Sequence, residues 1–90
     1  EHLAKERARA ADPITAAILA HVDQLIDAEV ARCRTRESVE VCQAVERSLR
    51  HVAGVLLHTP MVRAAQLAEQ DRLADYVHAL DTLFGVEVKV

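Results

Sequence analysis

Two series of mostly aliphatic side chains, spaced three or four residues apart, limit what this 90-residue chain can fold into. Residues three and four apart share one face of an α-helix, so each series predicts a long amphipathic helix. A short polar turn separates the two series, and the pair therefore favours a helical hairpin. The first series is Leu19, Val22, Ile26, Val30 and Cys33, and the second is Cys42, Val45, Leu49, Val52 and Leu56.

The composition favours helices throughout. Hydrophobic residues make up 51% of the chain, but it has one Phe, one Tyr and no Trp, so its apolar content is mostly Ala, Val, Leu and Ile. Two Gly and two Pro are too few for the turns of a sheet-rich fold, and the expected fold class is all-α. A chain of this length buries only about 60% of its unfolded surface, so a partner or a neighbouring domain should help to complete its core.

Proline and capping residues set the expected boundaries of the two long helices. Residues 1–12 are interpreted as the end of a connecting helix or as a boundary segment, because they offer little apolar surface. Asp12 is expected to cap the first long helix, with Pro13 in its first position. Pro60 has no amide hydrogen and disfavours helix at the preceding residue, so we expect the second long helix to stop near His58.

Two shorter helices are expected after this stop. With Thr59 as its cap, the third helix would cover residues 60–70, and the fourth would cover about residues 71–84. Gly85 is placed to take the left-handed conformation that ends a helix. Residues 86–90 alternate as a strand would, but nothing is expected to pair with them, and they are predicted to form a frayed tail.

Charge and hydropathy exclude several classes of protein. The net charge of -3 argues against an autonomous nucleic-acid binder, because such domains usually carry a basic excess. No apolar run approaches the roughly 20 residues of a membrane span and no signal peptide is visible, so the expected location is cytoplasmic. Arg32, Arg34 and Arg36 form a local basic cluster near a predicted helix end, where cations interact favourably with the helix dipole.

The two cysteines lie on opposite arms of the predicted hairpin. Cys33 and Cys42 are almost equidistant from its turn, so they can approach each other across it. In a cytoplasmic protein, two reduced and buried small side chains are the favoured interpretation. A disulfide is the alternative, and it would require closely spaced α-carbons.

No constellation for catalysis or for metal binding is recognisable. His51 and His58 are seven residues apart and share a helical face, but two ligands do not complete a tetrahedral site. His58 is expected instead to help satisfy carbonyl groups at the helix end before Pro60. The chain has no Gly-rich phosphate loop and no converging nucleophile, base and orienting group. No catalytic, cofactor-binding or metal-binding residue is therefore predicted in this segment.

Three blocks of sequence resemble one known family. Residues 56–60, Leu56-Leu57-His58-Thr59-Pro60, resemble the Leu-Leu-His-x-Pro-Thr-x-x-Leu segment in the C-terminal dimerisation domain of glutamyl-tRNA reductase. Upstream, Pro13-Ile14 and Glu29-Val30 with Arg32 are similar to the family's Pro-x-Ile and Glu-Leu-x-Arg. Downstream, Tyr76, Ala79-Leu80 and Leu83-Phe84-Gly85 are similar to its closing block.

The chain departs from the family pattern at two places. Gly54-Val55 stands where Asn-Lys is common, which puts any role of that Lys in doubt, and Met61 stands where Thr is usual. Gly in a helix interior costs about 1 kcal/mol relative to Ala, so Gly54 either loosens the second helix or lets another helix approach closely.

The resemblance implies a role for the segment and an activity for its parent protein. The parent would be an NADPH-dependent oxidoreductase that converts glutamyl-tRNA to glutamate 1-semialdehyde, an early step of tetrapyrrole (porphyrin) biosynthesis. Its catalytic Cys and its NADPH site belong to other domains of the family, so no cofactor is expected in these residues. Residues 13–85 would form a helical dimerisation domain, a small bundle completed by dimerisation. The parent would bind glutamyl-tRNA, and a contact of the arginine cluster with that tRNA rests on the resemblance alone.

The expected partner is a second copy of the chain, which offers the same patch across a two-fold axis. The sequence supports burial along both aliphatic series, but it does not divide the intrachain core from the dimer interface. The residues predicted as interface or core are Leu19, Val22, Ile26, Val30, Val45, Leu49, Val52 and Leu56.

A different class of protein competes with this interpretation. A free-standing helical interaction or regulatory module would share the architecture without any catalytic domain. The reading frame upstream of Glu1 discriminates the two, because a Rossmann fingerprint and a catalytic Cys domain there indicate the reductase.

Overall fold

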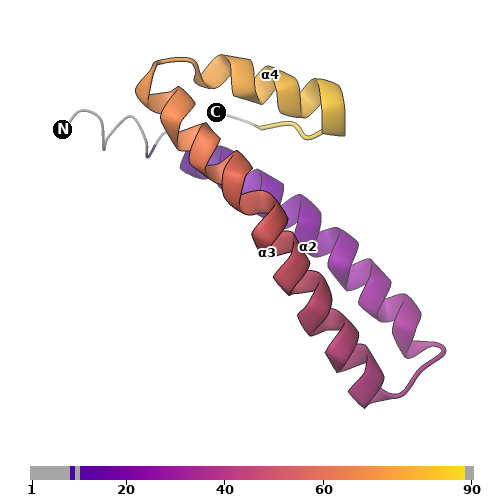
Figure 1. Ribbon diagram of the computed structural model, residues 1–90. Coiled ribbons are helices and arrows are strands. Elements are labelled where there is room, and N and C mark those ends of the chain that lie inside the picture. The colour runs from indigo at the N-terminus through magenta and orange to yellow at the C-terminus, as the bar shows by residue number, and fades with distance from the viewer. Residues whose placement is uncertain (1–8, 10, 89–90) are drawn as a thin grey trace.

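The computed structural model describes residue 9 and residues 11–88. Within them the fold is all-α, as predicted, and contains no strand. Residues 1–8 and 10, which hold most of the expected connecting segment, lie outside the described residues, as do the last two residues of the expected tail. Figure 1 shows two long antiparallel helices side by side, with a shorter helix at the end of the hairpin away from its turn. The helices are α2 (Asp12–Arg34), α3 (Val39–Glu69) and α4 (Leu73–Phe84).

The start of α2 differs slightly from the expectation. Ala11 occupies the cap position and offers no side-chain hydrogen bond, whereas Asp12 is the first helical residue. Pro13 lies in the first turn, where its missing amide hydrogen costs nothing. The carboxylate of Asp12 therefore acts on the N-terminal end of the helix dipole and not as a cap.

The turn between α2 and α3 is held by side chains at both helix ends. The hydroxyl of Thr35 donates a hydrogen bond to the carbonyl oxygen of Arg32 at 2.7 Å. Ser38 has an extended backbone, and its Oγ accepts a hydrogen bond from the amide of Val41 at 3.2 Å. Both bonds satisfy backbone groups that helix ends leave free, so they fix the point at which the hairpin reverses.

The helix break expected near His58 is wrong, and so is the prediction of separate second and third helices. α3 is one helix of 31 residues with Pro60 inside it. A proline in a helix interior removes the hydrogen bond to the carbonyl four residues earlier and costs about 3 kcal/mol or more. Packing beyond the proline offsets this cost, because Ala64 is fully buried and Tyr76 of α4 donates a hydrogen bond of 2.9 Å to the Pro60 carbonyl oxygen. One short helix, α4, therefore follows the hairpin in the described residues, instead of the two expected.

Two residues with positive φ lie on either side of α4. Asp71 (φ 58°) lies in the turn from α3, and Gly85 (φ 65°) ends α4 as predicted. Beyond Gly85 the amide of Val86 donates to the carbonyl oxygen of Leu80 at 3.3 Å, and Val86 joins the core beside Ile18. The prediction of a frayed tail is therefore wrong at Val86, because the left-handed turn directs the chain back onto the helices.

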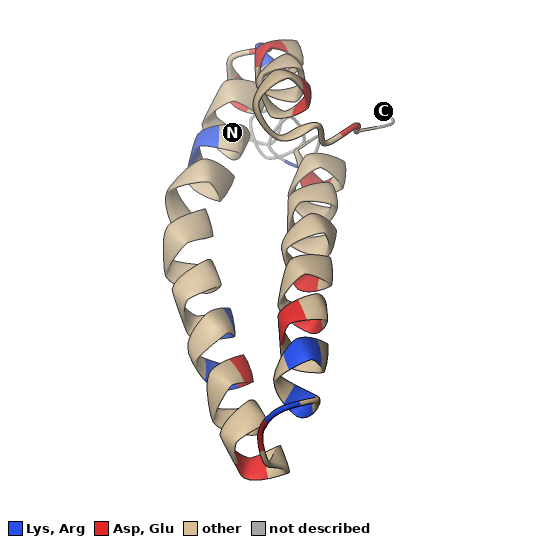
Figure 2. Cartoon of the chain, turned by 90° about the vertical axis from the view of Figure 1, so that its right-hand side faces the viewer, with Lys and Arg blue, Asp and Glu red and all other residues tan. Residues whose placement is uncertain are grey.

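The core is small and lies mainly at the α4 end of the hairpin. One buried cluster joins α2, α4 and the segment after α4, and a second joins the start of α2 to the last turns of α3. Charged residues gather toward the hairpin turn and on α4, as Figure 2 shows. The two clusters are Ile14, Ile18, Leu80 and Val86, and Ala11, Ala64 and Ala68.

Candidate functional site

An apolar groove opens between α2, α3 and α4. Its volume is about 560 Å³, and apolar side chains from all three helices form its walls. Ile18 and Leu80 belong to the buried core and form its inner side, together with the half-buried Leu57. His21, Thr59 and Arg63 add the polar groups, and the remaining lining residues are Val22, Leu25, Leu56, Pro60, Tyr76, Ala79, Leu83, Phe84 and Val86.

Four large apolar side chains of this groove are left mostly in solvent. The exposed fractions are 59% for Leu25, 70% for Leu56, 73% for Leu83 and 64% for Phe84. We call these four residues the exposed rim. Val52, which is 60% exposed, lies one helical turn before Leu56 and extends the same surface along α3. A contiguous apolar surface rimmed by polar groups is typical of an interaction site.

The eight residues predicted as interface or core divide into three groups. Burial removes Ile26 and Val30 from any contact with a second molecule, whereas Val52 and Leu56 remain available for one. The role of the exposed members in an interface stays a prediction. Ile26 and Val30 are buried, Val22, Val45 and Leu49 are half-buried, and Leu19, Val52 and Leu56 are exposed.

Three rim residues are missing from the predicted interface set. Leu25 lies beside the first aliphatic series, and Leu83 and Phe84 lie at the end of α4. Helical periodicity places Leu83 and Phe84 on the same face as Leu80. This apolar helix end could have indicated from the sequence that both residues belong to an interface. Only the structure shows that Leu80 is the last buried side chain of α4 and that the next two large side chains lie outside the core.

The family-like motif at residues 56–60 has mixed surroundings. Leu57 packs against the core, whereas Leu56, His58 and Thr59 are exposed. Because α3 continues through Pro60, the expected role of His58 at a helix end is wrong. The motif instead supplies two lining residues of the groove, Thr59 and Pro60, in addition to the two leucines.

Outside the groove lining, the hairpin carries an ion-pair cluster that sequence reasoning missed. The guanidinium of Arg50 donates to Asp23 Oδ1 at 3.0 Å, to Asp27 Oδ1 at 3.1 Å and to Glu46 Oε2 at 3.0 Å. The hydrogen bond to Glu46 is the largest cause of an increase in the pKa of Arg50. The ion pair between Glu46 and Arg50 could have been predicted, because residues four apart are neighbours on a helix. The bonds from Arg50 to α2 could not, because they depend on how the two helices pack. This cluster joins α2 to α3 at the surface.

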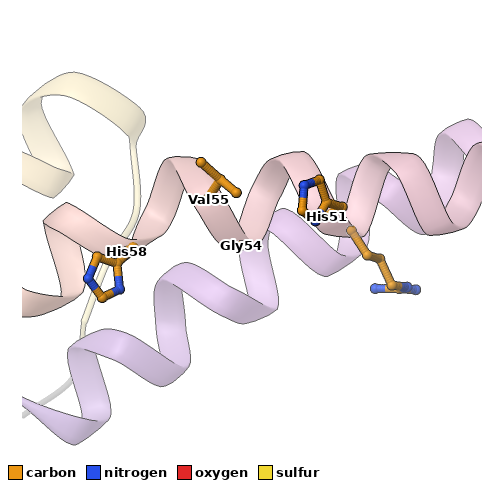
Figure 3. A pocket seen from close by; sticks show the side chains of 5 residues that line it. His51, Gly54, Val55 and His58 are labelled. Carbon is orange, nitrogen blue, oxygen red and sulfur yellow. The ribbon is translucent and has the colours of Figure 1, made fainter.

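A shallow depression on α3 lies next to this cluster. It has a volume of about 540 Å³ and is lined by Arg50, His51, Gly54, Val55 and His58. Figure 3 shows the two imidazoles separated along the helix, with Gly54 and Val55 between them. Among the described residues, no group of three or more His, Cys, Asp or Glu side chains is placed to hold a metal ion. A side chain at Gly54 would point into open space, since nothing lies within 4 Å of an added Cβ.

The two cysteines lie near the hairpin turn and are free thiols. Both are buried, with exposed fractions of 5% for Cys33 and 2% for Cys42. Burial, followed by a hydrogen bond with Cys33, raises the pKa of the Cys42 thiol to about 11. The thiol of Cys42 is therefore neutral and poorly nucleophilic at physiological pH.

The arginine cluster predicted near the turn is exposed. Arg32 and Arg34 lie in the last turn of α2, where their charges suit the helix dipole. Arg32 also forms an ion pair of 3.7 Å with Glu29, three residues earlier.

A helical hairpin with an exposed apolar groove, and with an ion-pair cluster outside that groove, has the features of a helical association domain. The comparison with protein families agrees with this class, because the family model described as "Glutamyl-tRNAGlu reductase, dimerisation domain" matches residues 1–86. The chain belongs to the glutamyl-tRNA reductase dimerisation-domain family. This match does not favour the alternative of a free-standing interaction module.

Curated relatives support the same family. A glutamyl-tRNA reductase of Micrococcus luteus is 39% identical over 88 residues, which cover 97% of this chain and 20% of the relative. A glutamyl-tRNA reductase of Kocuria rhizophila is 37% identical over 84 residues, which cover 92% of this chain and 19% of the relative. The chain thus spans about one fifth of the length of these relatives. No solved structure matches the chain significantly. None of the described helices is long and apolar enough to cross a membrane.

Proposed function

We propose that this chain joins two copies of a glutamyl-tRNA reductase into a homodimer through the apolar groove and its exposed rim. The observation that carries the proposal is the gathering of Leu25, Leu56, Leu83 and Phe84 around one groove. In a family described as a dimerisation domain, such a surface is suited to a second copy of the same chain. A two-fold dimer would use the same patch on both copies and complete the small helical bundle.

The energetics favour a contact that extends beyond the rim. Full burial of a Leu or Phe side chain contributes about 1.5–3 kcal/mol, and the four rim residues of each copy are already partly covered. Their combined gain is of the same order as the roughly 4–15 kcal/mol that association costs in lost motion. We therefore include Val52 and Leu19 in the interface, whereas Ile26 and Val30 belong to the core of each copy.

For the parent protein we propose the activity that its relatives' name describes. The parent reduces glutamyl-tRNA with NADPH to glutamate 1-semialdehyde for tetrapyrrole synthesis, and it does so in the cytoplasm. We assign residues 13–85 to the dimerisation domain, and we assign catalysis and the binding of NADPH to other parts of the parent. NADPH oxidation by the full-length parent, with glutamyl-tRNA as substrate, tests this assignment, and free glutamate serves as the control.

The dimer is tested by sedimentation equilibrium of the 90-residue chain over a dilution series. We expect a dimer at micromolar concentration and a largely monomeric Leu56→Asp variant. An unpaired charge buried in a contact costs about 3–5 kcal/mol, which raises Kd by about 100-fold or more. Leu56 is 70% exposed, so its replacement should leave the protomer folded, as circular dichroism can verify.

Val39→Asp is the matched control for this experiment. Val39 is 62% exposed at the start of α3, near the hairpin turn and outside the groove lining. The Val39→Asp variant should dimerise with the same Kd as wild type. A monomeric wild-type chain at every concentration, or equal Kd values for Leu56→Asp and wild type, would contradict the proposed interface.

A further inference from the structure

We propose that Leu83 and Phe84 of each copy insert into the apolar groove of the other copy, so that the ends of the two α4 helices are exchanged across the two-fold axis. This inference rests on the proposed dimer and adds which side chains enter which site. The occupant of the groove is then a defined segment of a second copy of this chain.

The end of α4 is built as a rigid projection. Leu80, one turn before Phe84, is buried, and Val86, two residues after it, is buried as well. The amide of Val86 donates to the carbonyl oxygen of Leu80 at 3.3 Å, and the amide of Gly85 donates to that of Asp81 at 3.0 Å. The chain is therefore held on both sides of Phe84. Little conformational freedom remains to be lost when the ring enters a partner, which favours binding.

Phe84 and Leu83 are also the side chains with the most to gain from being covered. Leu83 has the largest exposed fraction among the exposed large hydrophobic residues, and Phe84 is the only Phe of the chain. Phenylalanine buries about 150–250 Å² in a contact and is a frequent anchor at interfaces. Both residues stand at the mouth of the groove without filling it.

The groove has room for such an anchor. Its volume of about 560 Å³ lies within the range of about 300–1,000 Å³ typical of pockets that bury small-molecule ligands, which exceed a Phe side chain in size. Leu25 and Leu56 flank the opening, and Ile18 lies at the buried side. Val52 is exposed one helical turn before Leu56 on α3, so a copy that covers this side of α3 also reaches the groove.

The charges around the groove and on α4 are complementary. Arg63 and His21 line the groove, and among the described residues the guanidinium of Arg63 bonds only to Gln66 Oε1, at 3.1 Å. The last turn of α4 carries no basic residue, and Asp81 lies three residues before Phe84, so this carboxylate and the C-terminal end of the helix dipole make the end of α4 negative. When the partner's α4 end enters the groove, this negative end approaches Arg63.

The exchange is tested by nuclear magnetic resonance on a one-to-one mixture of isotope-labelled and unlabelled 90-residue chains. An isotope-filtered nuclear Overhauser experiment records contacts between copies only. We expect signals from the Phe84 ring of one copy to the methyl groups of Leu25 and Leu56 of the other. Signals that join the two hairpins without involving Phe84 would overturn the exchange and leave the proposed dimer standing.

A binding measurement gives the second, independent readout. Phe84→Ala should raise the dimer Kd by about 30-fold, the effect of a residue that dominates an interface. Val39→Ala removes an equally exposed apolar side chain outside the groove and should leave Kd unchanged. Equal Kd values for these two variants, or a dimer whose groove holds a small apolar molecule instead, would overturn the exchange. A monomeric wild-type chain would overturn the proposed dimer and the exchange together.

Discussion

The hydroxyl of Tyr76 donates a hydrogen bond of 2.9 Å to the carbonyl oxygen of Pro60, and this bond joins α4 to α3 at the proline. Tyr76 is half-buried and packs against both buried clusters of the core. Burial raises the pKa of its hydroxyl, so the proton needed for the bond is retained through the neutral range. The Tyr76 ring and its hydroxyl together position α4, and with it Leu83 and Phe84 at the mouth of the groove.

The Tyr76→Phe variant should be less stable than wild type by about 0.5–1.5 kcal/mol, because it removes one intramolecular hydrogen bond while the ring stays in place. Urea unfolding followed by circular dichroism measures the change. Equal unfolding midpoints and slopes for the two proteins would show that the bond contributes nothing to the attachment of α4.

The Pro60→Ala variant should be more stable than wild type, by up to about 3 kcal/mol, because alanine restores the amide hydrogen and removes the ring from a helix interior. Pro13→Ala is the control, since Pro13 lies in the first turn of α2 and should change stability little. Thermal unfolding of both variants at one protein concentration provides the measurement. If Pro60→Ala is less stable than wild type, the result would contradict a continuous α3 and would indicate that a separate helix starts at the proline.

Pro60 shows why the fold was only partly predictable from the sequence. Local rules for proline correctly describe its chemistry, but they do not include the burial of Ala64 and Ala68, which keeps α3 helical beyond it. The aliphatic spacing predicted both arms of the hairpin, because periodicity is a local property. The exposure of Phe84 and Leu83 depends on where the core ends, and that is decided by the packing of α4 on α2 and α3. The Gly85 turn was predicted, but its effect on Val86 was not.

The Arg50→Met variant should lower stability modestly at low ionic strength, because it leaves Asp23, Asp27 and Glu46 without their shared cation. These pairs are largely exposed, so salt should screen the repulsion between the remaining carboxylates. We expect the difference from wild type to shrink as sodium chloride is raised from 10 mM to 1 M in urea unfolding experiments, since the Debye length falls from about 30 Å to about 3 Å over the corresponding range.

The matched control for this prediction keeps a positive charge at position 50. Arg50→Lys keeps the cation but cannot hold three carboxylates with the planar arrangement of a guanidinium, so it should fall between wild type and Arg50→Met. A salt-independent loss in Arg50→Met would indicate that the guanidinium acts through its directed hydrogen bonds and not through its net charge.

Cys42 should make the stability of the domain fall with rising pH in a defined window. Its thiol pKa is raised from 9.0 to about 11 in the folded chain, because burial disfavours the thiolate. Below pH 9 the thiol is neutral in the folded and the unfolded chain, and its contribution to stability is fully present. Between pH 9 and 11 the unfolded chain releases a proton that the folded chain retains, so the unfolded state is favoured progressively.

We expect the free energy of unfolding of wild type, relative to Cys42→Ala, to decrease from pH 8 to pH 10.5. The comparison removes the contributions of Tyr76 and other groups that both proteins share. A difference between the two proteins that stays constant over this range would show that the Cys42 pKa is the same in the folded and unfolded chain.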